Sequence, residues 1–247
     1  MTIPGCDFGH FYRNSMAMAT HSILPYLFSF IFVLNFSSSG FSLPSSAVGV
    51  FPPTCKRIEC PAFDAIDKGD GYEIRRYNST PWISTSEINE ISFVGATRDG
   101  FLQLFNYIQG NNEYSVKIEM TGPVITQILP SDGPFCTSSF VVSFYVPKEN
   151  QADPPPAKGL HLQRWDVKYA AVRQFTGFVS DSDVGVEASA LYSSIAGSRW
   201  ASAIDKSRKA YSTSPYTVAQ YNSPFEYTDR VNEIWILFDE EDSSSSS

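Results

Sequence analysis

Positive charge is scarce in this sequence. The 247 residues include 18 Lys and Arg against 26 Asp and Glu, and the net charge is -8. Binding to nucleic acid or to an anionic membrane surface requires basic side chains that neutralise phosphate groups. We therefore expect neither partner. Part of the negative charge lies in a low-complexity tail, residues 240–247, which we expect to be disordered.

Histidine and the common catalytic motifs are also lacking. Only 3 His occur, and His10 and His21 fall in an N-terminal segment that reads as a leader. His161 remains as a candidate metal ligand or acid/base group, although its strand-like context is more typical of a surface residue. No dinucleotide-binding, P-loop, nucleophile-elbow or H-E-x-x-H pattern is present. Glu233 is more typical of a hydrogen-bonded strand carboxylate than of a general base. We predict no enzymatic activity.

One long apolar run stands near the start of the chain, at residues 23–36. It is too short for a typical membrane span and suits the apolar region of a signal peptide, with small residues for cleavage following near Gly40 or Ala47. We interpret residues 1–40 as a signal peptide. A further hypothesis is that translation begins at Met16, which would make residues 1–15 an upstream extension. The alternatives are a membrane anchor and a buried helix.

Cysteine usage agrees with export. Of the 4 Cys, one lies in the leader, which leaves Cys55, Cys60 and Cys136. Cys55 and Cys60 are close enough in CKRIEC to close a small disulfide loop in an oxidising compartment. Three cysteines allow three pairings, so the connectivity stays open. A zinc site is the alternative, but no second Cys/His pair has suitable spacing. Asn78 begins an N-x-[ST] glycosylation motif, in which the following Pro81 can hinder modification.

Hydrophobic periodicity divides the rest of the chain into strands and helices. Residues 41–70 are rich in Pro, Ser, Asp and Gly, and we interpret them as a linker with a loop that carries Cys55 and Cys60. Helices are expected over 93–109, with one apolar face, over 184–195 and over 200–210. The face of the first consists of Val94, Phe101, Leu104, Phe105 and Ile108. Strands are expected at 72–77, 82–88, 115–129, 138–146, 161–165, 169–175, 216–221 and 232–238.

The order of these elements repeats. Two strand–helix–strand–strand halves are joined by a Pro-rich loop at residues 150–159, which predicts an α+β domain over residues 71–239. Several connections are too short for parallel crossovers, so the sheet should be mainly antiparallel. Closure into a barrel would remove its exposed edges.

A Gly-Pro pair interrupts the segment 115–129, which otherwise reads as one strand. Gly122 is expected to supply an unusual backbone angle or a close approach, and Pro123 withholds a backbone donor from the ladder. We predict a bend or bulge that aims Met120 at the first helix. A wall of a pocket, or a soft contact to iron, is the alternative role for Met120.

Several motifs occur together in a fixed order: YEIRRY (72–77), KIEMTGPV (117–124), the Pro-rich loop, YAAVRQF (169–175) with its FTGF turn, and RVNEIWIL (230–237). In these motifs the chain resembles the SOUL haem-binding protein family, and most closely its plant secreted members. The resemblance runs from about Tyr72 to Phe238. It implies duplicated repeats that form a distorted antiparallel β-barrel flanked by two helices. It also implies reversible, non-covalent binding of haem or another tetrapyrrole, as a carrier or buffer in the secretory or extracellular space, either apoplast or vacuole.

The resemblance also implies a site, in a groove against the first helix and the loop before the last strand. Matching the motifs places Arg98, Phe101 and Phe105 on the helix, Tyr221 and Phe225 on the loop, and Met120 nearby. Arg98 is the candidate partner of the ligand's propionates, and a solvated helix cation is its alternative reading. His161 is a candidate axial ligand.

Asn106 and Glu226 stand where some family members carry basic residues. Because Glu226 would repel a propionate, we expect weak haem binding or a less anionic ligand. The alternative function is an extracellular protein-interaction module on the same fold, with a weak or lost haem site. The sequence names no protein partner.

Overall fold

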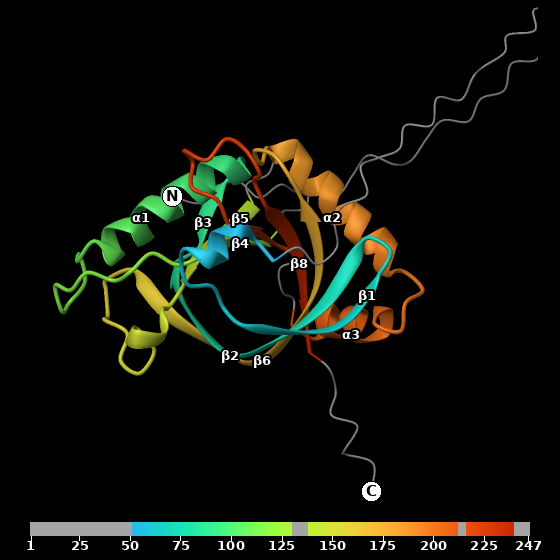
Figure 1. Cartoon of the computed structure of the whole chain (residues 1–247), viewed down its shortest axis with the longest axis horizontal. Helices are drawn as coiled ribbons and strands as arrows, with labels where there is room; N and C mark the ends of the chain where they lie inside the picture. The colour runs from blue at the N-terminus through green and yellow to red at the C-terminus, as the bar shows by residue number, and fades with distance from the viewer. Residues whose placement is uncertain (1–50, 130–137, 212–215, 240–247) are drawn as a thin grey trace, which may run out of the picture. The chain divides into compact units, whose positions relative to one another are not determined.

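A closed antiparallel barrel of six strands forms the centre of the fold (Figure 1). The computed structural model describes residues 51–129, 138–211 and 216–239. The barrel strands pair in the order β2, β6, β8, β7, β4 and β5, and β5 returns to β2. Their bounds are Tyr72–Thr85 (β2), Val124–Leu129 (β4), Ser138–Tyr145 (β5), Leu160–Phe175 (β6), Tyr216–Gln220 (β7) and Asn232–Phe238 (β8). The predicted α+β barrel is confirmed.

Two further strands and two 3-10 turns extend this barrel. Strand β1 (Phe63–Gly69) pairs with β2, and β3 (Ile88–Glu90) pairs with β5. The 3-10 turns cover Pro53–Lys56 and Lys148–Asn150. The description of residues 41–70 as linker and loop was therefore wrong for the part that forms β1. The expected leader, Cys136 and the acidic tail lie outside the described residues.

The barrel depends on two long strands, β2 and β6, which pair in one register from Glu73–Val172 to Thr85–Leu160, with a gap at Ser79. We expected two shorter strands in place of each, and in β2 the break was expected at Thr80-Pro81. The strand instead passes through Pro81, which pairs with Arg164, and only Ser79 leaves the extended region, with φ 50°. Pairing along both sides of the strand outweighs the local preference of one proline.

The Gly-Pro pair separates β4 from an irregular segment. Residues 115–120 are not a strand, and β4 begins at Val124, after the cis peptide between Gly122 and Pro123. Gly122 has no positive φ, but a Cβ atom there would lie 3.2 Å from Cδ1 of Ile58. The close approach is therefore confirmed and the unusual angle is not. Met120 packs against the hydrophobic cluster beneath the first helix.

The first helix, α1 (Phe93–Ile108), lies on β5 with a face that agrees with the predicted one at Leu104 and Ile108 but not at Val94 and Phe105. Its buried residues are Phe93, Ala96, Gly100, Leu104, Tyr107 and Ile108. Val94 and Phe105 stay 46% and 39% exposed. A Cβ atom on Gly100 would lie 2.3 Å from Cγ2 of Val142, so this glycine brings the helix backbone against the sheet. Phe101 and Phe105, the aromatic residues of the predicted face, therefore stay outside the fully buried face of α1.

Three helices flank the barrel, as the periodicity predicted, whereas the family resemblance implied two. Helix α2 (Asp181–Ile195) packs on β6 and β8, and α3 (Ala201–Tyr211) packs on β8. Ser180 begins α2 with a capping box that also involves Asp183, and such reciprocal capping stabilises the first turn. Inside the barrel, an aromatic cluster with Tyr77, Trp82, Trp165 and Trp235 fills the interior.

Candidate ligand-binding site

A groove of about 260 Å³ lies between α1 and the loops that precede α2 and β8. Its lining consists of Phe93, Val94, Thr97, Arg98 and Phe101 from α1, Val124 and Gln220 from the sheet, and Phe178, Val179, Asn222, Pro224 and Arg230 from the two loops. Small-molecule pockets of about 300–1,000 Å³ enclose most of a drug-sized ligand. A somewhat smaller groove encloses one edge of a large flat ligand and leaves the remainder on its rim.

The first turn of α1 is held at the groove by its own cap and by α2. Ser92 accepts a hydrogen bond from the Gly95 N–H at 3.0 Å, which satisfies one of the free donors at the helix start. The carboxylate of Asp181 accepts from the backbone N–H of Val94 at 3.0 Å and from the Ser92 hydroxyl at 2.9 Å. These bonds fix the position of the groove wall that α1 provides.

The loop before β8 is held together by Asn222 and Glu226. Oδ1 of Asn222 accepts from the Val231 N–H at 2.8 Å, and its Nδ2 donates to Glu226 at 3.0 Å. Glu226 also accepts from the Ser223 N–H at 3.1 Å and pairs with Arg57. The hydrogen bond from Arg57 is the largest effect that lowers the pKa of Glu226. Glu226 does not line the groove, so the expected repulsion of a propionate is not supported.

Phe178 forms the opposite wall because the turn that carries it is tied to β8. Asn232 Nδ2 donates to the Gly177 carbonyl at 2.8 Å, and Gly177 adopts φ 91°, a conformation that favours glycine. The Phe178 ring lies 5.9 Å from that of Tyr227, between centroids. The sequence singled out the FTGF turn as a motif but not Phe178 as a site residue. Only the tertiary fold places this turn opposite α1.

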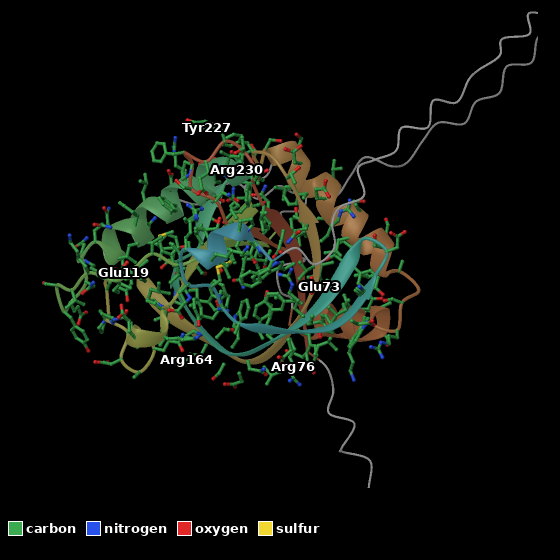
Figure 2. The ribbon with its side chains drawn as sticks, in the orientation of Figure 1. Glu73, Arg76, Glu119, Arg164, Tyr227 and Arg230 are labelled. Carbon is green, nitrogen blue, oxygen red and sulfur yellow. A yellow bond between two sulfur atoms is a disulfide. The ribbon has the colours of Figure 1, made fainter. Side chains whose placement is uncertain are left out.

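Arg230 is a charged groove residue that sequence reasoning also missed. It stands beside α1 at the end of the loop before β8 (Figure 2) and is 5% exposed. Its Nη1 donates to the carbonyls of Ser223 at 2.8 Å and Glu226 at 2.6 Å. The guanidinium lies 4.2 Å from the centroid of the Phe178 ring. The available signal was its position at the start of the RVNEIWIL motif.

The structure brings together only part of the predicted site. Arg98 and Phe101 line the groove, and Phe105 stacks on Phe101 with centroids 5.7 Å apart and planes at 15°. The Arg98 side chain is 74% exposed and pairs with its neighbour Asp99 at 3.3 Å. Phe225 lies on the loop before β8 and is 82% exposed, outside the lining. The ligand-binding roles of these residues stay predictions.

The other predicted residues lie elsewhere. Tyr221 follows β7, where successive side chains point to opposite faces, so that Gln220 meets the groove and Tyr221 enters the barrel. Met120 packs beneath α1, and His161 is exposed on β6 opposite Ser84. None of these three lines the groove. Their ligand-binding roles therefore stay predictions that the groove lining does not support.

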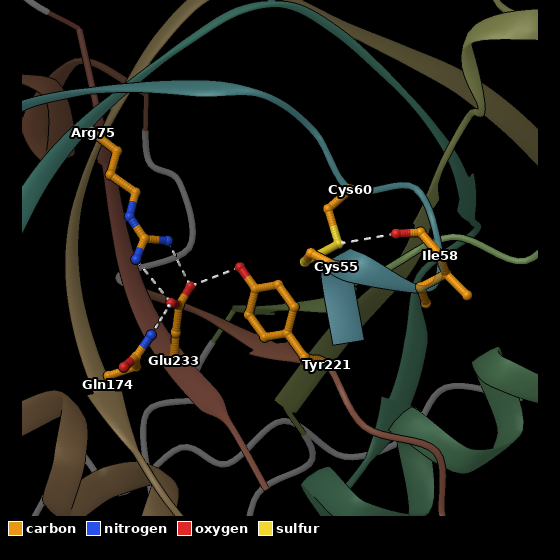
Figure 3. The surroundings of a disulfide bond; sticks show 7 residues. All are labelled: Cys55, Ile58, Cys60, Arg75, Gln174, Tyr221 and Glu233. Carbon is orange, nitrogen blue, oxygen red and sulfur yellow. Dashed lines mark hydrogen bonds and ion pairs between the residues drawn. A yellow bond between two sulfur atoms is a disulfide. The ribbon is translucent and has the colours of Figure 1, made fainter. Parts of the chain in front are cut away.

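A buried polar cluster lies inside the barrel (Figure 3). Glu233 accepts hydrogen bonds from Arg75 at two positions, both 2.9 Å, and from Tyr221 at 2.9 Å. Gln174 and Trp235 donate to it at 2.9 and 2.7 Å. Burial would lower the pKa of Arg75, but the Glu233 carboxylate raises it, while burial raises the pKa of Tyr221. The prediction of a hydrogen-bonded strand carboxylate is confirmed.

A disulfide closes the loop between Cys55 and Cys60, with Cα atoms 5.5 Å apart, and both residues pack against the aromatic interior (Figure 3). The predicted pair therefore forms. Within the described ranges, no group of three or more His, Cys, Asp or Glu could hold a metal ion. In that same part of the chain, no helix is long and apolar enough to span a membrane.

Comparison with known proteins identifies this architecture. The profile of the SOUL heme-binding protein family matches residues 58–237, and the chain belongs to this family. It is 35% identical over 176 residues to heme-binding protein 2 of Homo sapiens, and the matched segment covers 70% of this chain and 81% of that protein. It is 28% identical over 171 residues to heme-binding protein 1 of Xenopus laevis, covering 68% and 84%.

Proposed function

We propose that the chain binds haem or a related tetrapyrrole non-covalently in the groove beside α1. The observation that carries this proposal is an apolar, aromatic-walled groove bordered by two arginines, in a chain of the SOUL family. Flat apolar ligands bind in such grooves, with a few polar groups that set their orientation. Membership of this haem-binding family supports a binding protein rather than an enzyme, and we propose no catalytic activity.

The residues of the groove fit a macrocycle with acidic side groups. The Phe101 and Phe178 rings offer apolar surface from opposite walls, and Phe105 continues this surface beyond the lining. Arg98 and Arg230 supply positive charge for the propionates. Among the described residues of the lining there is no His, Cys, Met or Tyr. Recognition of the ligand therefore depends on contacts with the macrocycle and its propionates rather than on ligation of iron.

The cellular role follows from features outside the groove. We propose a secreted protein of the plant type that carries or buffers the ligand in the apoplast or the vacuole. The apolar leader supports this, as does the Cys55–Cys60 disulfide, because such bonds persist in oxidising compartments. Asn78 is exposed on β2, as a glycosylation site would need to be. The net charge of -8 supports a function without nucleic acid or membrane partners.

An extracellular interaction module is the second candidate function. The loop before β8 exposes Phe225 and Tyr227 at 82% and 74%, and exposed aromatic side chains are enriched where proteins bind one another. The protein partner would have to cover this loop. The engagement of Glu226 by Arg57 weakens the argument that haem binding has been lost.

A haemin titration tests the proposed function. The full chain would be expressed through a secretory pathway and haemin binding followed by absorbance at the Soret band. We expect saturable one-to-one binding. Val94→Glu, in the groove, should weaken it at least about tenfold through lost apolar contact and charge repulsion. Val186→Glu, at an exposed valine of α2 outside the groove, is the matched control. A folded protein without saturable binding would favour the interaction module.

A further inference from the structure

Arg230 is a buried cation with no carboxylate partner among the described residues. Its side chain meets two main-chain carbonyls and the face of Phe178, and its Nε has no hydrogen-bond partner. Other arginines of the fold are paired, such as Arg75 with Glu233 and Arg173 with Glu187. Burying a charge is costly unless it is paired, so an unpaired guanidinium at a groove suggests a partner that arrives with the ligand.

Glu226, whose charge acts on Arg230, does not serve as this partner. Glu226 gives Arg230 only its main-chain carbonyl, while its carboxylate is engaged by Arg57, Asn222 and the Ser223 N–H. Burial accordingly has the larger effect on Arg230 and lowers its pKa, and the charge of Glu226 opposes this only in part. The loop before β8 therefore keeps the Glu226 carboxylate away from the buried guanidinium of Arg230.

We infer that Arg230 is the anion anchor of the groove and determines its specificity for planar apolar ligands that carry a carboxylate. This inference rests on the proposed function and names the residue that selects the ligand. Stacking on Phe178 fixes the plane of the guanidinium, which can then offer its remaining N–H groups to a carboxylate in a fork. The ligand's acid lies against the loop before β8, and its ring extends toward α1.

Arg98 has the weaker claim to this role. Its side chain is 74% exposed and already lies 3.3 Å from Asp99, so any further pair that it makes is screened by water. A charge-assisted hydrogen bond in a desolvated setting contributes more than an exposed one. The sequence pointed to Arg98 because it shares a helix with Phe101. The fold instead provides a buried arginine from a residue far along the chain.

The test compares haemin with haemin dimethyl ester, which keeps the ring and iron but lacks free carboxylates. The full chain and its R230Q, R230K and R98Q variants would be titrated with both. We expect the wild type to prefer haemin by about tenfold or more, R230Q to lose this preference, R98Q to keep it, and R230K to retain part of it.

Each outcome bears on the inference separately from the proposed function. If R230Q weakens both ligands equally, Arg230 has only a structural role and the inference fails. If the wild type binds both ligands equally well, the inference fails while the proposed function stands, and this comparison does not depend on the variants folding. If the wild type binds neither, the proposed function fails and the inference with it.

Discussion

Glu233 and Arg75 form a two-pronged ion pair inside the barrel, with both nitrogen–oxygen distances at 2.9 Å. The two residues are 158 positions apart and tie β2 to β8 across β6. Tyr221, Gln174 and Trp235 complete the hydrogen bonding of the carboxylate, which has no exposed surface. The pair is sealed away from the groove and serves the fold rather than the ligand.

Replacing Glu233 with Gln should therefore destabilise the protein strongly. Breaking a buried ion pair by removing one charge costs up to about 3–5 kcal/mol, and the loss here should fall at the lower end of this range, because Arg75 keeps a second partner, Glu73, at 3.1 Å. Urea unfolding followed by tryptophan fluorescence measures the loss. Glu187→Gln is the control, since its pair with Arg173 is partly exposed and should contribute at most about 1 kcal/mol. Equal losses for the two variants would contradict a structural role for the Glu233–Arg75 pair.

Gly100→Ala should destabilise the protein even though alanine favours helices. Its Cβ atom would lie 2.3 and 2.5 Å from the Val142 side chain, so α1 has to move away from β5. Overpacking of this kind costs about 1–3 kcal/mol. Gly185→Ala in α2 meets no atom within 4 Å and should stabilise by up to about 1 kcal/mol. Thermal unfolding of the two variants should show shifts of opposite sign, and two upward shifts would contradict the close contact.

The pH dependence of the loop before β8 should follow Glu226. The hydrogen bond from Arg57 lowers the pKa of this carboxyl in the folded protein, below the usual value of about 4.3. Its contribution to folding is then complete above the unfolded-state pKa and is lost as the pH falls through the lower, folded-state pKa.

An NMR titration of the Glu226 side-chain carboxyl carbon would measure this shift. Arg57→Ala should move the midpoint upward toward the usual value, because the largest cause of the lowering is removed. Glu226 is the acidic residue that holds the loop, so the same variant should loosen the loop around Arg230. A midpoint that stays in place would show that Arg57 does not control Glu226.

Iron should matter little to binding. No described residue of the groove lining is a His, Cys, Met or Tyr, so iron-free protoporphyrin IX should bind within about threefold of haemin. Fluorescence quenching and Soret titrations provide the two affinities. His161→Ala serves as the control and should change neither, since His161 lies outside the groove. A haemin affinity more than about tenfold higher, lost on His161→Ala, would show axial ligation instead.

Much of the fold could be predicted because its signals are local. The apolar period of α1 and the short spacing of the two cysteines in CKRIEC are visible without neighbours, and both the helix and the disulfide form as expected. Strand β1 was missed because its charged sequence, FDAIDKG, has no strong alternation and gains its structure from pairing with β2. Part of the candidate site was predicted too, since Arg98 and Phe101 share one helix face.

The remaining features depend on contacts between distant segments. The amino-acid sequence alone determines where α1 begins, at Ser92, and that one side of it is apolar. Only the tertiary structure decides which apolar side is buried, because Gly100 meets Val142 and leaves Phe101 in the groove lining, with Phe105 stacked on it. Tertiary contacts also decide which charged side chains near the groove are paired.

Glu226 is engaged by Arg57, 169 positions away, and within the described ranges Arg230 meets main-chain carbonyls but no carboxylate. Helix ends and disulfide loops are settled within a few residues, so they can be inferred from the printed sequence. Whether a charge is paired or free depends on desolvation and on the approach of a distant partner, and both exist only once the chain has folded.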